Sequence, residues 1–262
     1  EPPLPGEFFD LIGGTGTGRL IALMLGPLCM SVIEAITAYS WMSEEVFSET
    51  KWKGKESTFK ASKLEDFIKK IVAGRLGDSQ ARMLDLSGND PCKMFVCAMP
   101  AHSINPAIPP IFCNYQVPKG ATFNCQVWEA AQATTATPTI FKAIKIGEPF
   151  MQQLFIDAGI GCNNPIKQVI QEAKLIFSSQ HIACILSIGA GHPRTISLAR
   201  TGGFFSNILP LALCTTMHNL ATDCESMAEE IARQFDSIPN FYHHFSVDQG
   251  LQNFILGQWH QL

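Results

Sequence analysis

The sequence predicts an α/β fold, a three-layer sandwich in which helices cover both faces of a mostly parallel central sheet. Short apolar runs rich in β-branched and aromatic residues alternate along the chain with longer segments of helical periodicity. Alternation of strands with helices favours parallel pairing, because each helix carries the chain back across the sheet. The chain has 262 residues, of which 46% are hydrophobic and 16% charged, enough to form one large core. We therefore expect a single domain over residues 1–262.

A short strand, a tight turn and two helices are expected at the start of the chain. Residues 8–12 form an apolar run that leads directly into a cluster of glycines, and an apolar helical segment follows. The stretch 20–42 is apolar enough to suggest a membrane span, yet Pro27 and Glu34 divide it. Because Glu34 stands three residues after Ser31, the spacing of a capping box, we expect two packed helices here instead.

The rest of the chain continues the alternation of strands and helices. The polar stretch 49–60 predicts a solvent-exposed excursion between two helices. A further helix is expected over residues 64–71, with Ser62 and Glu65 as a second capping box and with Gly74 and Gly77 at its end. Three more helices are expected over residues 127–136, from Pro165 onward and over 220–235. Further strands are expected over residues 93–98, 111–115, 139–146, 154–156, 182–188 and 241–247.

The glycine-rich turn after the first strand has the frame of a nucleophile elbow. In α/β-type hydrolases a nucleophilic serine stands at the centre of G-x-S-x-G, on a sharp turn from strand to helix, with its backbone strained. The frame in this chain consists of Gly14, Thr15, Gly16, Thr17 and Gly18. Gly16 stands where the serine would be, and glycine carries no nucleophile but adopts strained backbone angles at low cost. We therefore expect the turn to be kept and covalent acyl transfer to be lost.

Four segments resemble motifs of the patatin-like phospholipase family, in the right order. Residues 9–18 resemble the family's elbow, whose central residue is serine. Residues 128–138 resemble its Ala-Thr-Ser-Ala-Ala-Pro segment, 157–159 its Asp-Gly-Gly or Asp-Gly-Ala motif, and 187–191 its Ser-Ile-Gly-Thr-Gly strand end. The likeness spans most of residues 8–250 and is strongest to intracellular fungal members. It implies a patatin-like fold and a lipid acyl hydrolase as the ancestral activity.

The resemblance also implies which positions carry the chemistry. The family uses a serine–aspartate dyad in which the aspartate is the base, so the nucleophile position is Gly16 and the base is Asp157. The other residues of the elbow frame supply elbow and oxyanion backbone. The family's main oxyanion loop is a glycine-rich Asp-Gly-Gly-Gly segment one helix before the elbow, and backbone donors of this kind are a large share of such catalysis. The sequence begins only a few residues before the elbow strand, so we expect a domain without the first strand, oxyanion loop and first helix.

Three functions remain open from the sequence. The first is an acyl ester hydrolase domain that is inactive because of Gly16, and the second is a pseudoenzyme that binds lipid, carbohydrate or protein. The third is a nucleotide site, because residues 13–18 also resemble the phosphate loop of the tubulin and bacterial cell-division GTPases. The patatin-like order of the later segments makes the third the least favoured.

Composition limits the partners. The net charge is −4 and the basic residues are scattered, so we expect no nucleic-acid partner. The nine cysteines include no C-x-x-C pair and stand mostly among apolar neighbours, which favours reduced thiols, a cytoplasmic location and no metal. The histidines that could line a cleft are His102 and His192, and His243 and His244 alternate along a strand, so none predicts a metal site. We expect no cofactor.

The expected ligand is a lipid or acyl ester. No signal peptide opens the sequence and no transmembrane segment is expected, which leaves open peripheral contact with a membrane. A protein or glycan partner also remains open.

Overall fold

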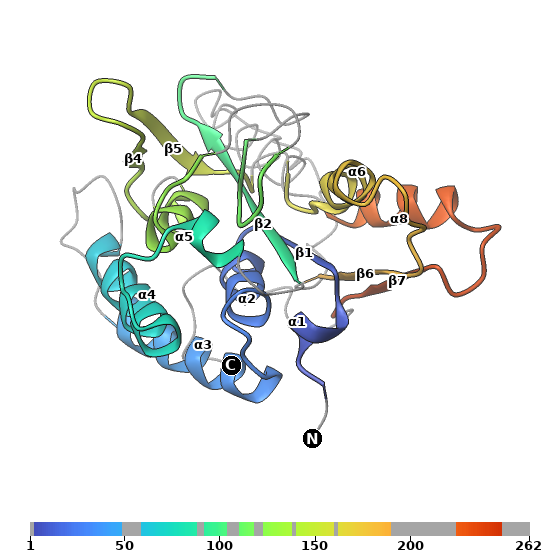
Figure 1. Cartoon of the computed structure of the whole chain (residues 1–262), viewed down its shortest axis with the longest axis horizontal. Coiled ribbons are helices and arrows are strands. Elements are labelled where there is room, and N and C mark those ends of the chain that lie inside the picture. The colour runs from blue at the N-terminus through green and yellow to red at the C-terminus, as the bar shows by residue number, and fades with distance from the viewer. Residues whose placement is uncertain are drawn as a thin grey trace, which may run out of the picture.

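Helices and strands are interspersed along the chain, with groups of helices between single strands or strand pairs (Figure 1). The computed structural model describes residues 3–48, 59–87, 92–103, 110–117, 123–137, 140–159, 162–189 and 224–247. A five-stranded sheet lies between helices, and a two-stranded sheet of the later residues accompanies it. The α/β class predicted from the sequence is confirmed.

The five-stranded sheet is mixed rather than mostly parallel. Its strands are β1 (Leu11–Gly14), β2 (Lys93–Pro100), β3 (Ile111–Cys113), β4 (Ile144–Ile146) and β5 (Gln153–Asp157). β1 is parallel to β2, whereas β3 and β5 are antiparallel to β2, and β4 is antiparallel to β5. The connections from β2 to β3 and from β4 to β5 have fewer residues than the dozen or more that a parallel crossover needs, so each pair is antiparallel. The second sheet pairs β6 (Ile185–Ile188) in parallel with β7 (Tyr242–Phe245).

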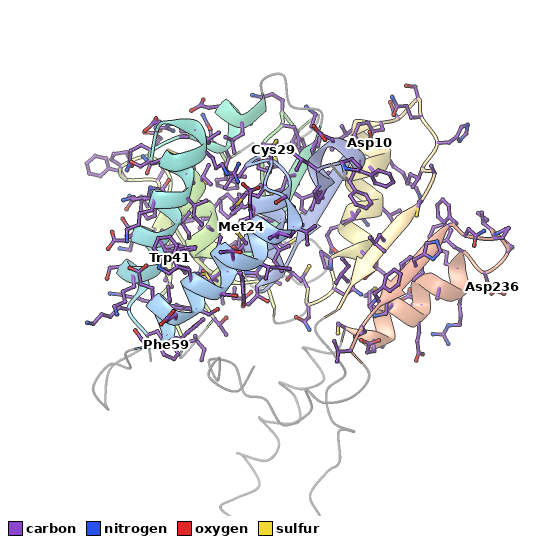
Figure 2. All side chains as sticks on the ribbon, turned by 90° about the horizontal axis from the view of Figure 1, so that it is seen from below. Asp10, Met24, Cys29, Trp41, Phe59 and Asp236 are labelled. Atoms are coloured by element: carbon purple, nitrogen blue, oxygen red, sulfur yellow. The ribbon has the colours of Figure 1, made fainter. Side chains whose placement is uncertain are left out.

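The two faces of β2 belong to two helical layers. The helices are α1 (Pro5–Phe8), α2 (Gly18–Leu25), α3 (Val32–Phe47), α4 (Ala61–Leu76), α5 (Val127–Thr135), α6 (Ile166–Ile176), α8 (Glu225–Gln234) and the 3-10 helix η1 (Met83–Ser87). Met94, Val96 and Ala98 pack in one core cluster with side chains of α2 to α5. Met24 of α2 and Phe59, which precedes α4, belong to the same cluster (Figure 2). The alternate β2 residues lie in a second cluster, against which side chains of α6 pack. This alternation confirms the three-layer arrangement.

One of the two capping boxes expected from the sequence is present. The Ser31 backbone N–H donates to Glu34 Oε2 at 2.8 Å, and the Glu34 N–H donates to Ser31 Oγ at 3.2 Å. The second prediction is wrong, because α4 begins after Lys60 and places Ser62 inside its first turn. Gly77 ends α4 as predicted, with a left-handed φ of 77° and an N–H that donates to the Ala73 carbonyl, whereas Gly74, also expected at this end, lies inside the helix.

Several boundaries differ from the sequence-based expectation. The first strand begins at Leu11 rather than at residue 8, because residues 5–8 form the short helix α1. The strand expected over 139–146 is limited to β4 among the described residues, and β6 is shorter than expected. Phe59, at the end of the expected exposed excursion, is buried, and residues 49–58 lie outside the described part. No helix in the described ranges is long and apolar enough to cross a membrane.

Candidate functional site

The glycine-rich turn joins β1 to α2 and has the backbone of an elbow. Gly16 has φ of +55°, in the left-handed region that side chains avoid. A Cβ built on Gly16 would meet nothing within 4 Å, so the turn presents this position to open space. At Gly14 a Cβ would lie 2.6 Å from the Arg19 Cα and 2.7 Å from the Gly18 carbonyl oxygen. The strained centre and the close approach expected of an elbow are therefore both present, the first at Gly16 and the second at Gly14.

Asp157 lies at the end of β5, with its carboxylate held by neighbouring donors. Gly159 donates its backbone N–H to Oδ1 at 2.7 Å, and the Thr137 hydroxyl donates to Oδ2 at 2.6 Å. The side chain is 10% exposed. Thr137 belongs to the segment 128–138 that resembles a family motif, whose last residue lies outside the described part. Two of the segments recognised in the sequence therefore meet at this carboxylate.

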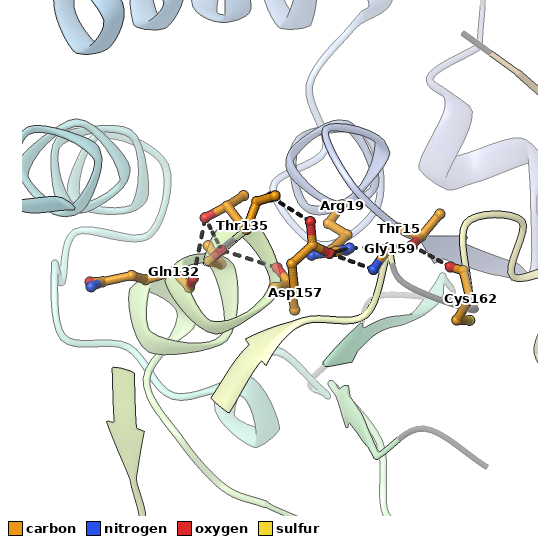
Figure 3. A network of polar contacts seen from close by, with 10 residues as sticks. Thr15, Arg19, Gln132, Thr135, Asp157, Gly159 and Cys162 are labelled. Carbon is orange, nitrogen blue, oxygen red and sulfur yellow. Dashed lines mark hydrogen bonds and ion pairs between the residues drawn. The ribbon is translucent and has the colours of Figure 1, made fainter. Parts of the chain in front are cut away.

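Arg19 connects the elbow to Asp157 (Figure 3). Its Nη2 forms an ion pair with Asp157 Oδ1 and donates to Thr15 Oγ1 at 3.2 Å. The Thr15 hydroxyl in turn donates to the Cys162 carbonyl at 2.6 Å. Arg19 is not part of any motif that predicts a site, although it is the single charged residue between Asp10 and Glu34. A lone charge beside an apolar helical segment must be exposed or paired, and this one is paired.

Two thiols lie close to the same guanidinium. A hydrogen bond from Cys97 to Cys162 raises the pKa of Cys97 well above its ordinary value and lowers the pKa of Cys162. Burial opposes the second shift, and the positive charge of Arg19 favours the thiolate at both positions. Because Cys162 is only 3% exposed, its thiol is shielded from reagents in solution.

The space behind the elbow is apolar and small. Tyr39 of α3 hydrogen bonds the side chain of Thr17, and burial raises the pKa of Tyr39. Tyr39 also lines an apolar cavity of about 20 Å³, together with side chains from α2, α4 and α5. A volume of this size accommodates roughly one water molecule. This cavity is therefore not a site where an acyl chain would bind.

The remaining sequence candidates do not join this network. His102 lies in an exposed turn, and His192, with residues 190–191 of the fourth motif, lies outside the described residues. His243 Nε2 lies 3.2 Å from the Asn240 carbonyl, whereas His244 Nε2 lies 3.3 Å from Glu225 Oε2, so the two rings contact different groups. Within the described ranges no three His, Cys, Asp or Glu side chains are grouped to hold a metal ion.

Comparison with known proteins assigns the family. Residues 3–170 match the family described as patatin-like phospholipase. The chain is 29% identical over 199 residues to human calcium-independent phospholipase A2-gamma, covering 71% of this chain and 24% of that protein. It is 26% identical over 258 residues to phospholipase A I of Arabidopsis thaliana, covering 76% of this chain and 19% of that protein. It is also 24% identical over 210 residues to probable inactive patatin-like protein 9 of Arabidopsis thaliana, covering 73% and 52%.

The chain thus spans about a quarter or less of the length of the first two relatives. The special likeness to fungal members stays a prediction. The family match includes the glycine-rich turn, whose Gly16 has a left-handed φ, and Asp157, which Arg19 connects to Thr15 of that turn. The match favours a patatin-like domain over a nucleotide-binding one. This chain belongs to the patatin-like phospholipase family.

Proposed function

We propose that this chain is a patatin-like domain that no longer hydrolyses acyl esters and acts by binding a lipid or acyl ester. The observation that carries the proposal is Gly16. In the dyad mechanism expected from the sequence, a serine oxygen attacks the acyl carbonyl while an aspartate accepts the hydroxyl proton, and an acyl-enzyme forms. Gly16 offers a hydrogen atom at that position, so no covalent intermediate can form there.

The comparisons support the ligand class and supply a precedent for lost activity. Two of the relatives are named as phospholipases, and a third is named as a probable inactive patatin-like protein. A protein or glycan ligand is the alternative, but no observation on the described residues favours it.

A fluorophosphonate probe tests the loss of the nucleophile. We expect no covalent labelling of the wild-type protein and no burst with a p-nitrophenyl ester, because these reagents report an activated serine. Thr17→Ser is the matched control, since it replaces the threonine hydroxyl beside the centre of the turn with a less hindered serine hydroxyl, and we expect it to stay unlabelled. Labelling of the wild-type chain at any residue contradicts the proposal, as does a serine at position 16 in the natural transcript.

Lipid binding is measured separately. We expect the wild-type protein to sediment with phosphatidylcholine vesicles, or to bind a fluorescent fatty-acyl ester, without turnover of the ligand. If neither binds, the lipid-binding half of the proposal is wrong, whatever the probe shows.

A further inference from the structure

Arg19 is a buried charge with one carboxylate partner. Its side chain is 0% exposed, and its Nε and Nη1 atoms have no hydrogen-bond partner. The only ion pair of Arg19 in the described part of the chain is that with Asp157. Burying a guanidinium costs several kcal/mol, of which a carboxylate partner offsets a large part. The protein therefore keeps Arg19 in place chiefly through the residue that aligns with the family's base.

The ion pair uses the atoms that a base would need. Oδ1 of Asp157 accepts from Arg19 Nη2 and from the Gly159 N–H, and Oδ2 accepts from the Thr137 hydroxyl. A general base must instead accept the proton of the attacking hydroxyl through one of these oxygens. Arginine stays protonated at all ordinary pH values, so it cannot pass that proton on.

The guanidinium also lies on the side of Asp157 that faces the elbow. The same Nη2 atom contacts Asp157 and Thr15, and Thr15 immediately precedes Gly16 (Figure 3). A hydroxyl returned to position 16 would have open space around it. To reach Asp157, however, it would compete with Nη2 for Oδ1.

We infer that Arg19 is a second block on acyl transfer, independent of Gly16, because it holds Asp157 in an ion pair that keeps this residue from acting as a base. The inference rests on the proposed loss of catalysis and extends it. It makes Arg19 a positioning residue that acts through Asp157. A rival role exists, since a guanidinium can stabilise an oxyanion. Its complete burial and its bond to Asp157 disfavour that role.

The test compares Gly16→Ser alone with Gly16→Ser combined with a change at Arg19. Arg19→Gln removes the charge, and Arg19→Lys keeps it as the matched control. The rate of fluorophosphonate labelling at position 16 is measured in the full protein, with the melting temperature of each variant. We expect G16S and G16S/R19K to label slowly and G16S/R19Q to label about 100-fold faster, the lower range of a general base. We expect the labelling rate of G16S/R19Q to rise with pH, because an aspartate must be ionised to act as a base. Adding Asp157→Asn should abolish both the faster labelling and this rise with pH.

Equal labelling of G16S and a folded G16S/R19Q, including no labelling of either, overturns the inference. Slower labelling of G16S/R19Q also overturns it and assigns Arg19 to oxyanion stabilisation. If R19Q fails to fold, Gly16→Cys serves as the second test, because a thiol depends less than a hydroxyl on a general base for its reactivity. If iodoacetamide alkylates G16C while G16S stays unlabelled, position 16 is accessible and the base is blocked, which supports the inference. If iodoacetamide does not alkylate G16C, the site is closed and the inference is wrong. Rapid labelling of G16S also overturns the inference, because it shows that no block exists.

These outcomes are separate from those of the proposed function. Labelling of the unmodified chain removes the proposed loss of catalysis, whereas the comparison of the Arg19 variants concerns only the block.

Discussion

The carboxylate of Asp157 is held by donors from three parts of the chain. Arg19 comes from the first turn of α2, Thr137 from the segment after α5, and Gly159 from the turn after β5. A buried carboxylate is tolerated only when such donors replace its lost hydration. Each donor therefore contributes to stability as well as to the site.

Replacement of Thr137 by Val should show how much one donor contributes. Val keeps the shape of Thr but removes the hydroxyl that donates to Oδ2 at 2.6 Å. A hydrogen bond to a charged group is worth about 1.5–3 kcal/mol, so we expect the free energy of unfolding to fall by about that amount in urea denaturation. Thr37→Val is the control, because the exposed Thr37 hydroxyl bonds only a backbone carbonyl of its own helix. An equal loss of unfolding free energy in the two variants would show that the hydrogen bond from Thr137 to Asp157 contributes no more to stability than the exposed hydroxyl of Thr37 does.

At the scale of the element, two serines with the same sequence spacing behave differently. Ser31 has extended backbone angles and forms both bonds of a capping box, whereas Ser62 lies within α4 and is exposed. The pattern of residues is alike, but the start of α4 is set by its packing rather than by its local sequence. Leu64, Phe67, Ile68 and Val72 of α4 are buried in the main core.

Alanine substitution should distinguish the two serines. Ser31→Ala removes an N-cap and should lower the free energy of unfolding by about 1 kcal/mol. Ser62→Ala should leave it unchanged within about 0.5 kcal/mol, because alanine favours a helix and no cap is lost. Thermal or urea unfolding of the two variants measures both values. A similar cost at both positions would mean that the cap at Ser31 is not formed in solution.

At the scale of the whole molecule, β2 brings the parts of the site together. Gly14 of β1 lies opposite Val96, and Asp157 of β5 lies opposite Ala98, on the other side of the same strand. The two positions on β2 are separated along the strand by roughly 7 Å. The glycine-rich turn and Asp157 could be chosen as candidates from the sequence because each belongs to a local motif, and their catalytic roles stay predictions. The directions of β3, β4 and β5, and the pairing of Arg19 with a residue 138 positions away, depend on tertiary contacts that no local pattern contains.

The packing of α2 on β1 makes a further prediction about the elbow's glycines. Gly14→Ala would place a Cβ against the Arg19 Cα and the Gly18 carbonyl, and overpacking against backbone costs about 1–3 kcal/mol or more. Gly18→Ala meets nothing within 4 Å at the first position of α2 and should be neutral or stabilise by up to about 1 kcal/mol. Melting temperatures report both changes. A tolerated alanine at position 14 would contradict this account of the turn.

The crowding at Gly14 bears on how inactive members of an enzyme family are recognised from their sequences. If this glycine is needed for a helix to rest on a strand, selection for folding alone preserves it after the chemistry has gone. Part of a hydrolase motif can then persist after the hydrolytic activity is lost, for a reason unrelated to catalysis. The informative positions in such sequences are those under no packing constraint, as at the open centre of the turn, and those that place a charge beside the acidic side chain, as Arg19 does.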